Sequence, residues 1–99
     1  MSDELPTPQL ICDDVLDISG VAELRAQLLA ALELGESFCV DASAVERIDT
    51  AALQVFTAFF QDAASRQMSV QWQSPSAALC RAAGLLGLSS LLNLPAAAA

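Results

Sequence analysis

The feature that most constrains the fold of this chain is the alternation of short apolar runs with longer segments of helical periodicity. Three segments place apolar residues at the three- and four-residue spacing of one helix face: 21–34, 49–67 and 75–87. The predicted inner faces are Val21, Leu24, Leu28, Ala31 and Leu32 in the first helix, which Gly35 ends; Leu53, Phe56, Phe60 and Ala64 in the second; and Ala78, Leu79, Ala82 and Leu86 in the third, which Ser74 caps. The apolar runs between them are rich in the residues typical of strands. This order predicts an α/β fold in which helices are layered on a sheet.

Four apolar runs are predicted as strands: 10–12, 15–18, 38–40 and 70–73. Only Asp13 and Asp14 separate the first two, a spacing that suits a two-residue β-hairpin. The third run lacks polar alternation, as in a central strand covered on both faces. In the fourth run Trp72 alternates in phase with Val70, so we expect Trp72 in the core. We therefore predict a four-stranded mixed sheet covered by three to four helices.

The two ends of the chain differ from this central region. Residues 1–9 hold two prolines and no periodicity, which predicts a loose arm before a domain at 10–95, and the alanines at 96–99 are expected to fray. Residues 82–99 carry no charge, a pattern that could indicate a membrane anchor, but glycines, serines and Pro95 interrupt the stretch. We expect a packed short helix there and no membrane insertion.

The composition excludes several classes of function. Among the 99 residues there is no histidine, lysine or tyrosine, which removes a histidine base, a Schiff-base lysine and imidazole metal ligands. The net charge is −8, and eleven of the twelve acids lie in residues 1–50. A phosphate-binding surface for nucleic acid is therefore disfavoured, whereas a basic protein partner is possible. Cys12, Cys39 and Cys80 are widely spaced in apolar runs, and no secretory signal pattern is present, so we expect reduced, buried thiols in a cytoplasmic chain.

Candidate functional residues follow from the topology. Parallel strands bring their carboxyl ends to one edge, so Asp17, Asp41 and the start of the second helix should lie together. Asp49-Thr50 occupies the first turn of that helix, where free N–H groups and the helix dipole favour a phosphate. The alternative is that Asp49 or Thr50 only caps the helix. A third interpretation has Asp17, Asp41 and Asp49 binding Mg²⁺ or providing a carboxylate pair for acid–base catalysis.

The segments LDISGVAEL, VDASAVERIDTAALQVF and QSPSAALCRAAGLLGL resemble the STAS domain, a family named for sulfate transporters and anti-sigma-factor antagonists. The most specific part is a strand ending in aspartate (Val40-Asp41), a short loop, and the helix start Ile48-Asp49-Thr50-Ala51-Ala52-Leu53. In this family a partner kinase phosphorylates the hydroxyl residue, so the resemblance implies that role for Thr50. It also implies that Asp17, before the first helix, lies beside the partner surface.

The resemblance implies a non-enzymatic, phospho-regulated interaction module without a cofactor, whose partner is a kinase or an anti-sigma-like ATPase. The expected docking surface is the start of the second helix with its flanking loops: Asp17, Asp41, Ser43, Asp49, Ala51, Leu53 and Gln54. Phosphate on Thr50 would release the partner by repulsion. Thr50 is also similar to the residue in the small STAS subunit that accompanies bacterial lipid-transport ABC ATPases, where it would be a neutral contact. A chemotaxis-type signalling scaffold is a third alternative.

Overall fold

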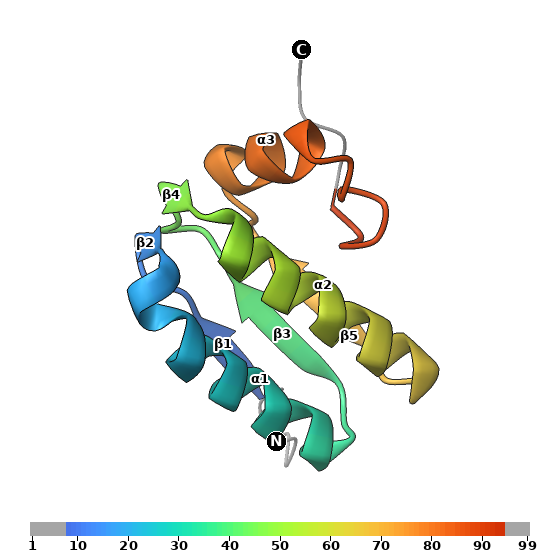
Figure 1. Cartoon of the computed structure of the whole chain (residues 1–99). Helices are drawn as coiled ribbons and strands as arrows, with labels where there is room; N and C mark the ends of the chain where they lie inside the picture. Colours follow the sequence, from blue (N-terminus) through green and yellow to red (C-terminus); the bar gives the residue numbers. More distant parts are fainter. Residues whose placement is uncertain (1–7, 95–99) are drawn as a thin grey trace, which may run out of the picture.

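The structure, a computed structural model, describes residues 8–94 (Figure 1). The three predicted helices are present as α1 (Val21–Leu34), α2 (Thr50–Ser65) and α3 (Ala77–Leu85). The strands are β1 (Gln9–Ile11), β2 (Val15–Leu16), β3 (Phe38–Asp41), β4 (Arg47–Ile48) and β5 (Val70–Gln73). Most of the predicted arm, 1–7, and the predicted tail lie outside the described residues, whereas Gln9 already belongs to β1.

The strands form two parallel sheets instead of the single mixed sheet that we predicted. One sheet has three strands in the order β1-β3-β5, and the other pairs β2 with β4. Val40 of the central strand β3 lies between Leu10 and Trp72 in the parallel register. In Figure 1, β2 and β4 lie at the end of the larger sheet where β3 terminates. The carboxyl ends of the strands therefore converge on one region, as the alternating order predicted.

The predicted hairpin between the first two strands is wrong, because β1 and β2 belong to different sheets. A two-residue hairpin of the favoured type needs positive φ at its central residues, which aspartate adopts at an energetic cost. Asp13 and Asp14 are not among the described residues with positive φ. The Asp14 carbonyl instead accepts hydrogen bonds from the N–H groups of Glu46 and Arg47, at 2.7 and 3.1 Å. These bonds direct the chain toward β4.

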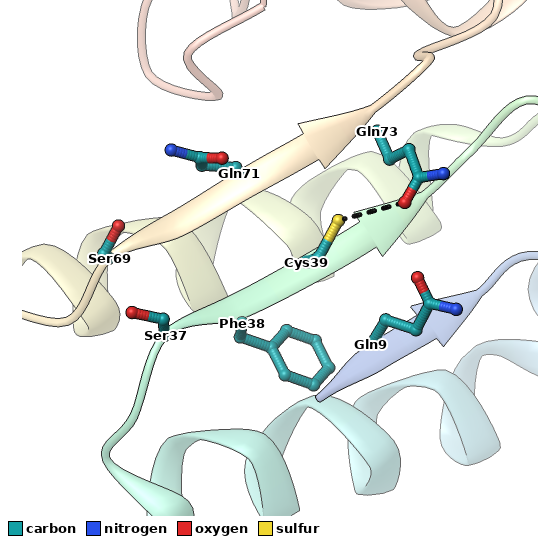
Figure 2. A pocket seen from close by; sticks show the side chains of 7 residues that line it. All are labelled: Gln9, Ser37, Phe38, Cys39, Ser69, Gln71 and Gln73. Carbon is teal, nitrogen blue, oxygen red and sulfur yellow. Dashed lines mark hydrogen bonds between the residues drawn. The ribbon is translucent and has the colours of Figure 1, made fainter. Parts of the chain in front are cut away.

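Within residues 8–94 the larger sheet is covered on one face only, which corrects the expectation for β3. Helices α1 and α2 pack on the face that holds Phe38 and Val40, both buried. Figure 2 shows the opposite face, where Gln9, Cys39 and the β5 glutamines form a shallow depression of about 540 Å³. The Cys39 thiol lies 3.6 Å from the Gln73 side-chain oxygen on this open face. A run of three residues is too short to reveal this alternation in the sequence.

The core lies between the helices and the covered face of the sheet. Phe56 is 0% exposed, and its ring lies 5.2 Å from that of Trp72, which also stacks on Phe60. Trp72 is half-buried, and its indole N–H donates to the Leu92 carbonyl at 2.7 Å. This bond ties the segment after α3 to β5. Trp72 therefore belongs to the core, as its phase with Val70 predicted.

The helix ends follow local chemistry. Gly35 ends α1 with φ 67°, a conformation that glycine adopts without steric cost. For α3 the predicted cap, Ser74 before Pro75, is wrong: Ser76 is the N-cap, and its hydroxyl accepts from the Leu79 N–H at 3.1 Å. Ser74 has φ 52° and lies in the turn before it. No helix within residues 8–94 has the length and apolar character needed to cross a membrane.

Candidate functional site

Two of the predicted aspartates follow a pair of hydrogen-bonded parallel strands. Asp17 comes directly after β2 and Asp49 directly after β4, and the Asp49 N–H donates to the Leu16 carbonyl at 2.9 Å. Asp41 ends β3, and its carbonyl accepts from the Cys12 N–H at 2.9 Å. The parallel pairing thus brings the starts of α1 and α2 to one end of the molecule (Figure 1).

Thr50 is the first residue of α2, and its side chain is exposed. Asp49 occupies the N-cap position with extended backbone (φ −86°, ψ 160°), but its carboxylate makes no capping hydrogen bond. The other aspartate and serine caps do: Asp17 accepts from Ser19, and Ser76 accepts from Leu79. The first-turn N–H groups of α2 are therefore left without a side-chain acceptor from Asp49. This finding disfavours the interpretation of Asp49 as a capping side chain.

Thr50 lies at the edge of an uncharged groove of about 370 Å³ between α2 and the segment after α3. Gln54, Gln61 and Thr57 provide its polar wall, and Leu86 and Leu88 provide its apolar wall. The Thr57 hydroxyl donates to the Leu53 carbonyl at 2.8 Å, so it is already paired. We call this feature the Thr50 groove. A partner that covers it would bury no charge of this chain.

A second cleft, of about 270 Å³, begins at Asp49 and separates β4 from α3. It contains two of the four arginines, Arg47 and Arg81, with Glu46 and the exposed Leu85. Glu46 and Asp49 also line this cleft, so two positive and two negative charges lie close to the start of α2. Sequence reasoning missed this cleft because Arg47 and Arg81 are far apart in the chain.

The carboxylates of Asp17 and Asp41 each bind a serine two residues further along. Asp17 accepts from the Ser19 hydroxyl at 2.6 Å and from its N–H at 3.1 Å, and these bonds lower the pKa of Asp17, the hydroxyl having the larger effect. Asp41 accepts from the Ser43 N–H at 3.0 Å and its hydroxyl at 2.7 Å, which lowers the pKa of Asp41, chiefly through the N–H. Both aspartates therefore carry negative charge and stiffen their turns.

The remaining predicted docking residues differ in exposure. Gln54 is exposed and Ala51 is half-buried, so both contribute to the surface of α2. Leu53 is only 1% exposed and belongs to the core, so its side chain is no part of a docking surface. The sequence pattern also placed Leu53 on the apolar stripe of α2. The structure confirms that position, so the prediction of Leu53 as a docking residue is wrong. Ser43 is exposed, with its hydroxyl bonded to Asp41.

Two exposed leucines were not predicted as surface residues of interest. Leu85 is 81% exposed and Leu86 is 49% exposed, at the end of α3; Leu86 lines the Thr50 groove, whereas Leu85 lines the cleft between β4 and α3. We expected Leu86 on the inner face of that helix, but Leu79, Cys80 and Ala83 form the buried face. Consecutive residues of a helix point in different directions, so Leu85 and Leu86 cannot both face the core. The two adjacent leucines were therefore the feature of the sequence that indicated an exposed apolar side chain here.

The Mg²⁺ alternative required Asp17, Asp41 and Asp49 to form one cluster, which the described residues do not do. No three of the cysteine, aspartate and glutamate residues in 8–94 are grouped so that they could hold a metal ion. Burial, with the charges of Asp41 and Asp13, raises the pKa of the Cys12 thiol to about 12. A thiol with so high a pKa is protonated at neutral pH and is a poor nucleophile.

Comparison with known proteins agrees with the resemblance found in the sequence. A family model described as "Mlab, STAS domain" matches residues 6–93, which include every helix and strand described above. No curated protein matches the chain. Because the family model covers most of the chain, from the N-terminal strand to the segment after α3, this chain belongs to the STAS domain family.

Proposed function

We propose that this STAS domain is a non-enzymatic interaction module of the anti-sigma-factor antagonist type, which docks through the start of α2 and is switched by phosphate on Thr50. The observation that carries the proposal is the exposed Thr50 hydroxyl at the first residue of α2, beside an uncharged groove. The partner is a kinase or an anti-sigma-like ATPase. Thr50 would receive the phosphate from that kinase.

In the unmodified state a partner can cover the Thr50 groove without desolvating a charge. The exposed Leu86 lines this groove and offers apolar area, whose burial supplies binding free energy. Asp17 and Asp41, with lowered pKa values, remain ionised, and neither lines the Thr50 groove. They would contribute mainly to orientation and to the rate of association with a basic surface.

A phosphate on Thr50 would change this surface in two ways. It adds a charge of about −1.5 to −2, and burying that charge in an uncharged interface without a matching cation is costly. In the free protein the same phosphate is stabilised by the first-turn N–H groups of α2, which receive no side-chain hydrogen bond from Asp49. Both effects favour the free phosphorylated state over the complex, so partner affinity falls.

The test compares Thr50 variants in binding to a purified partner. Thr50→Ala should keep the stability within about 0.5 kcal/mol, because Asp49 and not Thr50 is the N-cap. It should abolish phosphate incorporation by the cognate kinase. Thr50→Glu should weaken partner binding in part, since glutamate lacks the dianion and the third oxygen.

Ser65→Glu is the matched control, because Ser65 is exposed at the opposite end of α2 and gains the same charge. This variant should bind the partner as the unmodified protein does. Phosphate found on Ser43 or another residue would contradict the proposal. So would equal weakening by Thr50→Glu and Ser65→Glu, because a general charge effect would then explain the loss.

A second candidate function is that of an accessory subunit bound permanently to a lipid-transport ABC ATPase. Leu85 and Leu86, 81% and 49% exposed, are neighbours that a permanent partner would cover. The family description also names Mlab. In this role Thr50 is a neutral contact, so Thr50→Glu should bind its partner as tightly as the unmodified chain. That outcome separates the two candidates.

A further inference from the structure

One surface of the helix layer is not used by the proposed Thr50 switch. A groove of about 390 Å³ runs between α1 and α2. Its apolar walls are formed by Leu28, Leu29 and Leu32 of α1 and by Val55, Ala58 and Phe59 of α2. Leu29 is 48% exposed, which leaves a large apolar side chain in water at this position. We call this feature the α1–α2 groove.

The groove has the length of a helix and carries one charge of each sign. In Figure 1, α1 and α2 run in the same direction from the end that holds β2 and β4. Arg25 and Asp62 are the charged residues of its described lining. Arg25 is four residues beyond Val21 on α1, and Asp62 is eleven beyond Ala51 on α2. Val21 and Ala51 are the first lining residues of α1 and α2, so measured from them Asp62 lies seven residues, or about 10 Å, further along the groove than Arg25.

We propose that the α1–α2 groove binds an amphipathic helix of a partner protein, with an acidic residue placed against Arg25 and a basic residue placed against Asp62. Seven helical residues, or two turns, span about 10 Å, so both charges of the bound helix fall on the face that carries its apolar anchors. The inference rests on the proposed interaction function and names the element that the partner contributes.

The net charge favours a partner over a second copy of this chain. Two copies, each with a charge of −8, repel one another, whereas a more basic helix would be attracted. Ala51 and Gln54 line the groove at its upper end, and Gln54 also lines the Thr50 groove. One partner could therefore cover both surfaces, with its helix extending down α1 and α2 from the Thr50 contact.

The probe is a synthetic amphipathic helix of about 14 residues, the length of α1, with leucines at helical spacing and a glutamate and a lysine seven positions apart. A second peptide has the same composition with the two charges four positions apart. Each is titrated into the isotope-labelled full chain, and amide shifts are followed by NMR. We expect shifts confined to α1 and α2, and about two- to fivefold tighter binding of the seven-residue spacing, since surface ion pairs are weak.

Two variants locate the binding. Leu29→Glu should abolish it, whereas the matched control Leu34→Glu should not, because Leu34 is 57% exposed on the same helix but does not line the groove. Arg25→Glu should weaken binding of the seven-spaced peptide, and a peptide with lysine at both positions should restore it. Because both charges of the variant groove are negative and both peptide charges are then positive, this rescue is the same whichever way round the peptide binds.

Several results would overturn the proposal: no shifts at millimolar peptide, shifts centred elsewhere, or equal affinity for both spacings. A dimer in sedimentation that Leu29→Glu dissociates would also overturn it, because the groove would then hold a second copy. Thr50 does not line the α1–α2 groove, so Thr50→Glu should leave peptide binding unchanged. Failure of the peptide test and failure of the Thr50 switch are thereby distinguishable.

Discussion

Removing the indole N–H of Trp72 should destabilise the protein and loosen the segment that borders the Thr50 groove. This N–H donates to the Leu92 carbonyl at 2.7 Å, and Leu92 is 0% exposed. Water cannot replace the donor without a local movement of the chain. The perturbation therefore leaves a buried acceptor unpaired at the point where residues 88–94 attach to β5.

The size of the effect follows from the contacts. Leaving a buried carbonyl unpaired costs about 1–3 kcal/mol. Trp72→Phe also loses part of the ring that packs on Phe56 and Phe60, which adds about 1 kcal/mol. The sum is about 2–4 kcal/mol, which lowers the melting temperature of a domain of this size by about 10–20 °C.

The assay is urea unfolding followed by far-ultraviolet circular dichroism, because the protein has a single tryptophan and the variant loses its fluorescence. Replacing tryptophan with benzothienylalanine keeps the ring shape and removes only the N–H, and the single tryptophan makes this substitution specific. We expect this variant to lose about 1–3 kcal/mol, with faster amide exchange at 88–94. Equal stability of the benzothienyl and unmodified proteins would refute the argument.

Two further predictions concern titrating groups. Because the pKa of Cys12 is raised from 9.0 to about 12, the unfolded chain loses this proton first, so the stability should fall as the pH rises above 9.0. Cys12→Ala should remove that slope in urea unfolding, and a slope that persists would contradict the assignment to this thiol. Asp17 and Asp41 have lowered pKa values, so their small contribution is present above 3.8 and is lost as the pH falls below it. The hydroxyls of Ser19 and Ser43 each lower the pKa of the aspartate two residues before them, so by NMR titration Ser19→Ala should raise the pKa of Asp17 and Ser43→Ala that of Asp41. An unchanged aspartate pKa in either variant would refute the role of that hydroxyl.

The sequence by itself determined the helices and the place of Thr50. The spacing of Leu24, Leu28 and Leu32 predicted α1, and Gly35 predicted its end. The stripe through Leu53, Phe56 and Phe60 predicted α2, with Thr50 in its first turn. These predictions hold because helix periodicity and helix ends depend on residues within a few positions of one another.

The site was predictable only in part. The alternating order predicted Asp17, Asp41 and the start of α2 at one edge of the sheet, but the cleft that holds Arg47 and Arg81 and the Thr50 groove depend on how α3 packs against β4 and α2. Leu86 shows the difference clearly, since the spacing within its helix predicted an inner position and it is half exposed. In a helix of only nine residues, such as α3, the orientation of the last turn depends on contacts with neighbouring elements and not on the spacing of apolar residues alone.

Only the tertiary structure decided how the strands pair and which sheet face is open. The chain between β1 and β2 is short enough for a hairpin, yet β1 pairs with β3 and β2 with β4. Strands of two to four residues carry too few side chains to specify a partner or a covered face. Their pairing is set by contacts between residues about 30 positions apart, formed when α1 and α2 pack on the sheet, and no local pattern records those contacts.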